Sequence, residues 1–132
     1  MNTPHLSLLF AGLLGLTQCA LTMLVIGRRV QAQIILGDGG DEPLLRRISA
    51  QANFSETVPI ALLLMLLLEL RGLHAGLLLG LGCTLLLGRW LHAAGLLSPR
   101  AKWARVAGMA MTVAVISVQA VMCVWTFCTD LA

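Results

Sequence analysis

The chain has 132 residues, of which 58% are hydrophobic and 11% are charged, and its formal net charge is +3. Nine basic and six acidic side chains are too few to cover the surface of a soluble domain of this length. The composition therefore excludes an ordinary soluble globular protein. It indicates an integral membrane protein that is surrounded by membrane lipids and has no nucleic-acid partner.

Four apolar blocks divide the chain. The first, residues 6–26, and the last, residues 106–127, contain no charged side chain, and the two blocks between them carry only a few polar residues. No Lys or Arg precedes Arg28, so the first block lacks the basic region of a signal peptide and is expected to be retained as a helix. Each block is long enough to cross roughly 30 Å of hydrocarbon at about 1.5 Å per residue. We predict a single all-α membrane domain over residues 1–132, a four-transmembrane-helix bundle with helices at about 5–27, 43–71, 73–97 and 103–128.

The basic residues gather at one end of such a four-helix array. Only Arg71 lies at the opposite end, and Arg89 falls within the third helix. An excess of Lys and Arg marks the cytoplasmic side of a membrane protein. We therefore predict that both termini lie outside and that the first and third connections face the cytoplasm. Seven basic residues belong to that end: Arg28, Arg29, Arg46, Arg47, Arg100, Lys102 and Arg105.

The second predicted helix begins with polar residues in an otherwise apolar run, SAQANFSETVPIALLLMLLLEL over residues 49–70. A carboxylate inside a membrane is costly unless another group pairs with it, and Pro59 removes a backbone donor. At about 100° per residue, Arg46, Asn53 and Glu56 fall on one face of this helix. These residues indicate a function beyond anchoring.

The third and fourth helices add polar residues at the same end of the bundle. Arg89 and His92 lie one turn apart, and Arg105 opens the fourth helix. Glu56 and Arg89 could form an ion pair that only holds the fold together. Alternatively, the excess of guanidinium groups over carboxylates could bind an anionic ligand. Antiparallel packing is expected to gather six side chains in the cytoplasmic half of the bundle: Arg46, Asn53, Glu56, Arg89, His92 and Arg105.

Small residues recur every four positions in the third apolar block. Small residues at this spacing let another helix backbone approach closely, so we predict a tightly packed interface with a helix of the same chain or of a second copy. The four cysteines form no CxxC pair, and no Cys/His cluster has zinc spacing. We therefore predict buried, hydrophobic cysteines and no metal site. The small-residue series consists of Gly72, Gly76, Gly80, Thr84 and Gly88.

Several segments resemble the signatures of one membrane family. AQANFSETVP at residues 50–59 is similar to the second-helix signature of the MAPEG family, the membrane-associated proteins of eicosanoid and glutathione metabolism, through its Asn53, Glu56 and Pro59. GRWLH at 88–92 resembles the third-helix motif, and RVAGM at 105–109 resembles the start of the fourth helix. LGDGG at 36–40 resembles a loop of the small bacterial YecN-like branch. The similarity covers nearly the whole chain.

The resemblance implies a homotrimer in a bacterial inner membrane, with glutathione bound between neighbouring subunits near the cytoplasmic face. It implies a glutathione-dependent enzyme of the transferase or peroxidase type, acting on lipophilic electrophiles or lipid hydroperoxides. Arg105 would be the catalytic residue, because an adjacent guanidinium favours the thiolate nucleophile. The residues that would bind glutathione are Arg28, Arg46, Gln51, Asn53, Glu56, Arg89 and His92.

Two positions depart from the family pattern. Ser49 stands where the family usually has Arg, with Arg46 and Arg47 nearby as substitutes, and Leu96 stands where catalytic relatives place Tyr. Two other classes of protein therefore stay open. One is a non-catalytic trimeric membrane protein of the same fold that binds another anionic or lipid ligand. The other is a small proton-coupled exporter, which the strong charge bias and the position of Glu56 among arginines disfavour.

Overall fold

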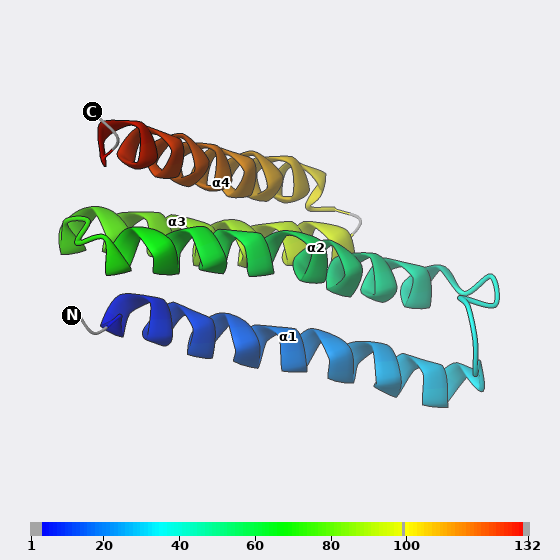
Figure 1. Ribbon diagram of the computed structural model, residues 1–132. Coiled ribbons are helices and arrows are strands. Elements are labelled where there is room, and N and C mark those ends of the chain that lie inside the picture. The colour runs from blue at the N-terminus through cyan, green and yellow to red at the C-terminus, as the bar shows by residue number, and fades with distance from the viewer. Residues whose placement is uncertain (1–3, 99, 131–132) are drawn as a thin grey trace.

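Four long helices make up the computed structural model, which describes residues 4–98 and 100–130 (Figure 1). No strand occurs among these residues, and each helix is long and apolar enough to cross a membrane. The predicted fold class, an all-α membrane bundle of four helices, is confirmed. The helices are α1 (His5–Ala32), α2 (Glu42–Leu70), α3 (Ala75–Leu97) and α4 (Lys102–Asp130).

Helix α1 continues beyond the predicted boundary at residue 27 and ends at Ala32. The prediction stopped at the first charged residues, Arg28 and Arg29, but long basic side chains can reach the membrane surface without ending a helix. The helix ends instead at Gln33, which adopts a left-handed conformation with φ of 55°. The backbone N–H of Gln33 reaches the carbonyl oxygens of Arg29 and Val30, which satisfies acceptors in the last turn.

A capping side chain sets the start of α2, and a turn sets the start of α3. Asp41 caps α2, because its Oδ1 accepts a hydrogen bond of 2.8 Å from the backbone N–H of Leu44. Helix α3 begins at Ala75 rather than at residue 73, since residues 71–74 form the turn that reverses the chain. Gly72 has a φ of 81° in this turn, a conformation that suits glycine. Gly72 is therefore a turn residue and is not part of a helical small-residue series.

The helices lie in three layers (Figure 1). Helices α2 and α3 occupy the middle, α1 packs on one side of them and α4 packs on the other, so that α1 and α4 make no contact in the described part of the chain. The α1–α2 and α3–α4 connections lie at one end of the bundle. We call this the basic end, because the seven basic residues predicted to lie together are found there. The turn between α2 and α3 lies at the opposite end.

Close packing of α3 against α4 depends on glycine. A Cβ atom on Gly108 would collide with the backbone of Gly88 and His92. A Cβ atom on Gly95 would collide with the backbone of Arg105 in the first turn of α4. The two helix backbones therefore approach each other along a line that side chains larger than hydrogen cannot occupy. Of the predicted small-residue series, Gly88 lies at this contact.

Other residues that were predicted to be packed lie on the outside of the bundle. Gly80 faces open space, and Gly76 meets only the ring of its neighbour His74, so neither makes a helix contact within one chain. A contact of these two glycines with a second copy stays a prediction, whereas the prediction of buried cysteines is wrong for the described chain. The reason is that a membrane bundle exposes apolar side chains to lipid or to another subunit, so low polarity does not imply burial. Cys19, Cys83 and Cys128 are exposed and Cys123 is half-buried.

Candidate functional site

A groove of about 650 Å³ lies where α2, α3 and α4 meet. Three predicted site residues line it, each from a different helix: Asn53 from α2, His92 from α3 and Arg105 from α4. We call it the α4 groove. It combines a polar end near the start of α4 with an apolar wall that continues toward the middle of that helix. The wall consists of Val106, Met109, Ala110 and Val113.

Arg89 lies beside Asn53 and is completely buried. Its Nη2 donates a hydrogen bond of 2.8 Å to Asn53 Oδ1, and its Nη1 lies 3.5 Å from Thr112 Oγ1. Its guanidinium carbon is 5.5 Å from the centre of the Phe54 ring, within the range of a cation–π interaction. Arg89 Nε has no partner, and no carboxylate pairs with Arg89 among the described residues. A buried positive charge without a counter-ion is unfavourable, so this region is suited to an anion.

His92 connects α3 to the first turn of α4. Its side chain is buried, and its Nδ1 lies 2.9 Å from the backbone carbonyl oxygen of Arg105. A carbonyl oxygen can only accept a hydrogen bond, so Nδ1 carries the proton and Nε2 of the neutral ring can accept one. This bond and the close contact of Gly95 fix the backbone of Arg105 against α3. The side chain of Arg105 remains exposed at the groove.

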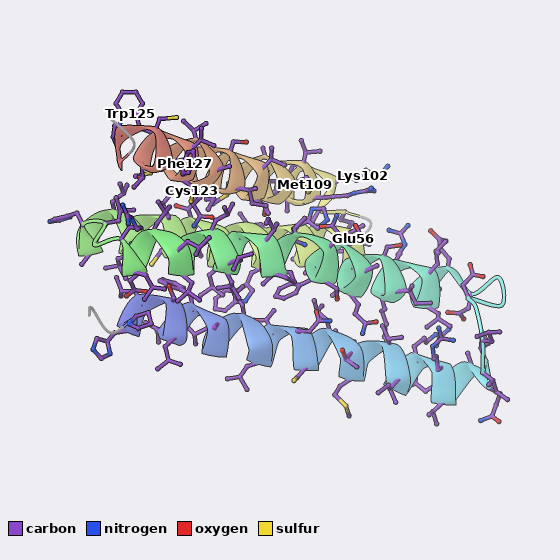
Figure 2. All side chains as sticks on the ribbon, in the orientation of Figure 1. Glu56, Lys102, Met109, Cys123, Trp125 and Phe127 are labelled. Carbon is purple, nitrogen blue, oxygen red and sulfur yellow. The ribbon has the colours of Figure 1, made fainter. Side chains whose placement is uncertain are left out.

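Glu56 lies outside the α4 groove. The residue is exposed on α2, where Figure 2 labels it, and it forms no ion pair within the described residues. Of the two alternatives drawn from the sequence, the ion pair of Glu56 with Arg89 is therefore not formed within the described chain, and Arg89 bonds to Asn53 instead. The cause is the orientation of α2. Its buried side includes Phe54, and Glu56 lies roughly 160° around the helix from that residue.

Three further residues predicted to bind a ligand lie away from the α4 groove and have partners in the chain. Arg28 donates two hydrogen bonds, of 3.0 and 2.6 Å, to the carboxylate of Asp41. The Arg28 guanidinium holds the pKa of Asp41 below its ordinary value. The other two pairs are Arg46 with Glu42, at 2.5 Å between Nη2 and Oε1, and Gln51 with Thr22, at 2.9 Å between Nε2 and Oγ1.

Ser49 and Leu96, the two positions that depart from the family pattern, both line the α4 groove. Ser49 Oγ donates a hydrogen bond of 2.8 Å to the carbonyl oxygen of Leu45 in its own helix. Leu96 is buried and belongs to the hydrophobic core. These positions therefore contribute a small hydroxyl and an apolar surface to the groove, rather than a guanidinium and a phenol.

Two residues that contact Arg89, Thr112 and Phe54, were not predicted from the sequence. Thr112 is fully buried and also donates a hydrogen bond of 2.8 Å to the carbonyl oxygen of Gly108. It is a polar residue in a block without charge, and seven residues after Arg105 it falls on the same face of α4, which could have identified it. Phe54 stands within the quoted signature, but nothing in the pattern indicates that its ring faces Arg89.

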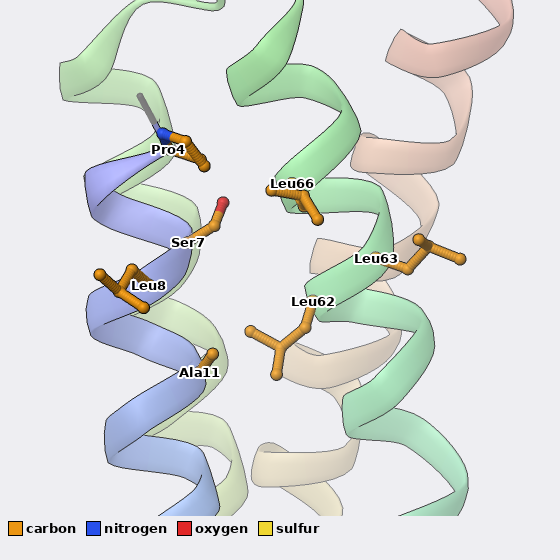
Figure 3. Close-up of a pocket in the computed structure, with 7 residues that line it drawn as sticks. All are labelled: Pro4, Ser7, Leu8, Ala11, Leu62, Leu63 and Leu66. Atoms are coloured by element: carbon orange, nitrogen blue, oxygen red, sulfur yellow. The ribbon is translucent and has the colours of Figure 1, made fainter. Parts of the chain in front are cut away.

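A second pocket, of about 300 Å³, lies between α1 and α2 near the end of the bundle opposite the basic end (Figure 3). Apart from Ser7, whose buried Oγ has no partner, its lining is apolar. No predicted site residue lines this pocket, so the α4 groove is the better candidate for a functional site. The lining residues are Pro4, Ser7, Leu8, Ala11, Leu62, Leu63 and Leu66.

Comparisons with known proteins place the chain in a family. The model of the MAPEG family matches residues 7–125. Inner membrane protein YecN of Escherichia coli strain K12 is 34% identical to the chain over 106 residues, which cover 80% of each protein, and the same protein of Escherichia coli strain CFT073 matches equally well. No solved structure matches significantly. The match over most of the chain and the four membrane helices together show that this protein belongs to the MAPEG family.

Proposed function

We propose that the protein is a glutathione-dependent membrane enzyme of the transferase or peroxidase type that acts on lipophilic electrophiles or lipid hydroperoxides. The single observation that carries the proposal is the composition of the α4 groove. Its polar end holds Arg105, His92 and Asn53, and an apolar wall continues from it along α4. A polar thiol compound and a lipophilic partner could therefore meet in one groove. Membership in the family supports this reading over a proton-coupled exporter.

The anionic part of glutathione fits the charge of this region. Glutathione carries two carboxylates, and a planar guanidinium binds a carboxylate through two parallel hydrogen bonds. Arg105 is exposed at the groove, and the buried Arg89 next to Asn53 has an Nε without a partner and no carboxylate among its described neighbours. The ammonium group of glutathione has no acidic partner in the groove of one chain, since Glu56 lies outside it.

The position of Glu56 supports a site completed by a neighbouring copy. Glu56 is exposed on α2, so it is available to a ligand or to a second subunit that covers this surface. We therefore propose a homotrimer in which the α4 groove of one subunit and the exposed surface of its neighbour share the ligand. In this arrangement Arg28 and Arg46 keep Asp41 and Glu42 as partners and do not contact the ligand in the α4 groove.

The residues of the chain have distinct roles in this proposal. Bound glutathione supplies a thiol nucleophile. Arg105 stabilises the thiolate form through its positive charge, and His92 and Gly95 position Arg105 through its backbone. Asn53 contacts the anionic part of the ligand, and the buried Arg89, bonded to Asn53 Oδ1, adds positive charge behind it without lining the groove. The apolar wall excludes water and accommodates the lipophilic second substrate.

Replacement of Arg105 tests the catalytic role. In Arg105→Ala the bound thiol should return toward its free pKa, and a change of about one to two units corresponds to about 1.4 to 2.7 kcal/mol of thiolate stabilisation. Conjugation of an aryl halide at pH 7 should then fall by about tenfold or more and recover partly at higher pH. Arg105→Lys should recover only part of the rate, because an ammonium does not reproduce the planar guanidinium.

The matched control for this test is Lys102→Ala. Lys102 is exposed in the first turn of α4 but does not line the groove, so its removal should leave the rate and the pH profile unchanged. If Arg105→Ala reacts like the parent protein at every pH, Arg105 is an ordinary surface arginine and the catalytic assignment is wrong.

A second candidate function is favoured by Ser49 and Leu96, which line the groove where the family pattern has Arg and Tyr. We propose, as the alternative, a non-catalytic trimer that binds another anionic or lipid ligand at the α4 groove. Calorimetric titration with glutathione, followed by the aryl halide assay, separates the two functions. Binding with turnover supports the enzyme, binding without turnover supports the alternative, and no binding contradicts a glutathione site.

The proposed orientation places the basic end in the cytoplasm of a bacterium and both termini outside. Its support is the uneven distribution of Lys and Arg and the similarity to an inner membrane protein. A reporter fused at Ala132 should therefore behave as periplasmic. A cytoplasmic reporter signal at this position would reverse the orientation and place the α4 groove near the outer face.

A further inference from the structure

A second groove, of about 370 Å³, lies at the basic end between α1, α2 and α3. It shares no lining residue with the α4 groove. Its lining combines two adjacent arginines with apolar side chains from three helices. We call it the basic-end groove, and its lining residues are Leu24, Glu42, Pro43, Arg46, Arg47 and Leu97.

Each arginine of the basic-end groove uses only some of its guanidinium N–H groups in hydrogen bonds within the protein. Arg46 donates from Nε and Nη2 to Glu42 Oε1, at 3.2 and 2.5 Å. Arg47 donates from Nη1 to the carbonyl oxygen of Leu24 at 2.8 Å. Arg46 Nη1 and Arg47 Nε and Nη2 have no protein partner in the described part of the chain. Two guanidinium groups and one carboxylate leave a net positive charge with free donors, which suits a phosphate group.

The exposed tryptophans of α4 indicate the level of this groove in the membrane. Trp103 and Trp125 are both exposed, and at 1.5 Å per residue they are about 33 Å apart along the helix, close to the roughly 30 Å of a bilayer's hydrocarbon core. Tryptophan is enriched at membrane–water interfaces. Figure 2 shows Trp125 at one end of α4 and Lys102, next to Trp103 in the sequence, at the other. The basic end therefore lies at the level of the lipid headgroups.

We propose that the basic-end groove binds an anionic phospholipid, whose phosphodiester contacts Arg46 and Arg47 and whose acyl chains begin against Leu24 and Leu97. Three observations agree on this occupant. The groove has surplus positive charge, it has apolar walls from α1 and α3, and it lies at headgroup level. The lipid bridges the basic ends of α1, α2 and α3. This binding is independent of glutathione, because no residue is shared with the α4 groove.

Thermal unfolding of the purified full chain in a neutral detergent tests the proposal. The probes are dihexanoyl phosphatidylglycerol, dihexanoyl phosphatidylcholine and inorganic phosphate. Phosphatidylglycerol should raise the Tm of the parent protein, and the other two should not. In Arg46→Gln the apparent affinity for phosphatidylglycerol should fall by about fivefold. Arg46→Gln is the decisive variant, because it loses only a contact with Glu42 on its own helix surface and circular dichroism can verify its fold.

The matched control is Arg100→Gln. Arg100 is exposed at the same end but does not line the groove, so this variant should respond to phosphatidylglycerol like the parent. An equal loss in both variants would mean a general charge effect and would overturn the site. An equal response to phosphatidylcholine would overturn the role of charge, and an equal response to inorganic phosphate would overturn the lipid as the occupant.

Discussion

Helices α1 and α4 are attached to the central pair of helices in different ways. Helix α4 lies against α3 along glycines, with the backbone of Gly108 next to that of Gly88 and His92. Helix α1 has no comparable close contact at its glycines: Gly12, Gly15 and Gly27 face open space. The seam between α1 and α2 borders a pocket of about 300 Å³ (Figure 3) and another of about 390 Å³.

Polar side chains hold α1 where close backbone packing is missing. At the end opposite the basic end, Glu69 of α2 accepts hydrogen bonds from the backbone N–H groups of Leu6 and Ser7, at 2.8 and 2.7 Å. In this way α2 caps the first turn of α1, since Pro4 offers no side-chain cap. Four bonds further along the helix add to the attachment: Gln18 to Ser55, Gln51 to Thr22, Arg47 to the Leu24 carbonyl and Trp90 to Thr17.

The comparison shows two solutions to one physical problem. In a membrane the hydrophobic effect does not drive helices together, because lipid is as apolar as the helix surface. Helices then associate through close van der Waals packing, which needs small residues, or through hydrogen bonds between side chains. Helix α4 depends mainly on the first, whereas α1 combines hydrogen bonds with side-chain packing, in which the Phe10 ring fills the space beside Gly82 of α3. The α4 groove, which needs fixed positions for His92 and Arg105, lies at the closely packed seam.

The largest effect is expected from Gly108→Ala. The added methyl group would collide with the backbone of Gly88 and His92, so α4 must move away from α3. We expect a loss of about 3 kcal/mol in the free energy of unfolding, measured by thermal unfolding in detergent. The control is Gly12→Ala, because a Cβ at that position meets no atom within 4 Å. Equal stability of the two variants would contradict the close packing of α3 and α4.

A smaller loss is expected from Glu69→Gln. Glutamine removes the negative charge at the start of α1 and replaces one of the two accepting oxygens with an NH2 group, so in this geometry the bond to Leu6 or the bond to Ser7 is lost. Bonds to charged groups contribute about 1.5 to 3 kcal/mol each in favourable settings, and we expect a net loss of about 2 kcal/mol. The same change at the exposed Glu56, which has no ion pair within the described residues, should alter the unfolding free energy little.

If both variants unfold at the temperature of the parent protein, Glu69 does not hold α1. The attachment of α1 would then depend on apolar contacts alone, and the distinction between the two helices would disappear. Hydrogen exchange at the backbone N–H groups of Leu6 and Ser7 provides a local measurement, since Glu69→Gln should speed exchange there before it affects α3 or α4.

Gln119→Leu on α4 is expected to increase stability, unlike the two preceding variants. Gln119 is fully buried on α4, and neither atom of its amide has a partner. Replacing an unpaired buried amide with an apolar side chain of similar size removes a desolvation penalty, so the variant should be more stable by about 1 kcal/mol. Gln51→Leu is the control, because it removes an amide bonded to Thr22 and should destabilise. A loss of stability in Gln119→Leu would contradict an unpaired amide at this position.

The sequence predicts the fold of this protein better than its site. The length of the apolar blocks and the charge bias are properties of continuous segments, so four helices and a basic end could be predicted. Asn53, His92 and Arg105 do meet, because antiparallel packing fixes their level in the bundle. Helical periodicity fixes angles within one helix but not which face packs on its neighbour, so Glu56 was placed beside Arg89 incorrectly. The role of Glu69, at the end of an apolar run, depends on a helix 62 residues away and has no local signal.

The smallest effect is expected at the basic end of α1, where Arg28 pairs with Asp41. The pKa of Asp41 is lowered from its ordinary 3.8, mainly by this guanidinium. A carboxyl group whose pKa is lower in the folded state stabilises that state above its ordinary pKa, and the contribution is lost as the pH falls through the lowered value. The Tm of the parent protein should therefore decrease as the pH falls from about 5 through the lowered pKa of Asp41.

Asp41→Asn separates the ion pair from the helix cap. Asparagine can still accept from the backbone N–H of Leu44 and caps a helix as well as aspartate does, but it carries no charge for Arg28. The decrease in Tm on acidification should be smaller in this variant than in the parent. Asp38→Asn, in the same connection but without an ion pair in the described chain, should keep the full decrease. If the Tm of Asp41→Asn falls on acidification as much as that of the parent, the Arg28–Asp41 ion pair does not stabilise the basic end of α1. The hydrogen bond from Arg47 to the Leu24 carbonyl would then hold α1 there.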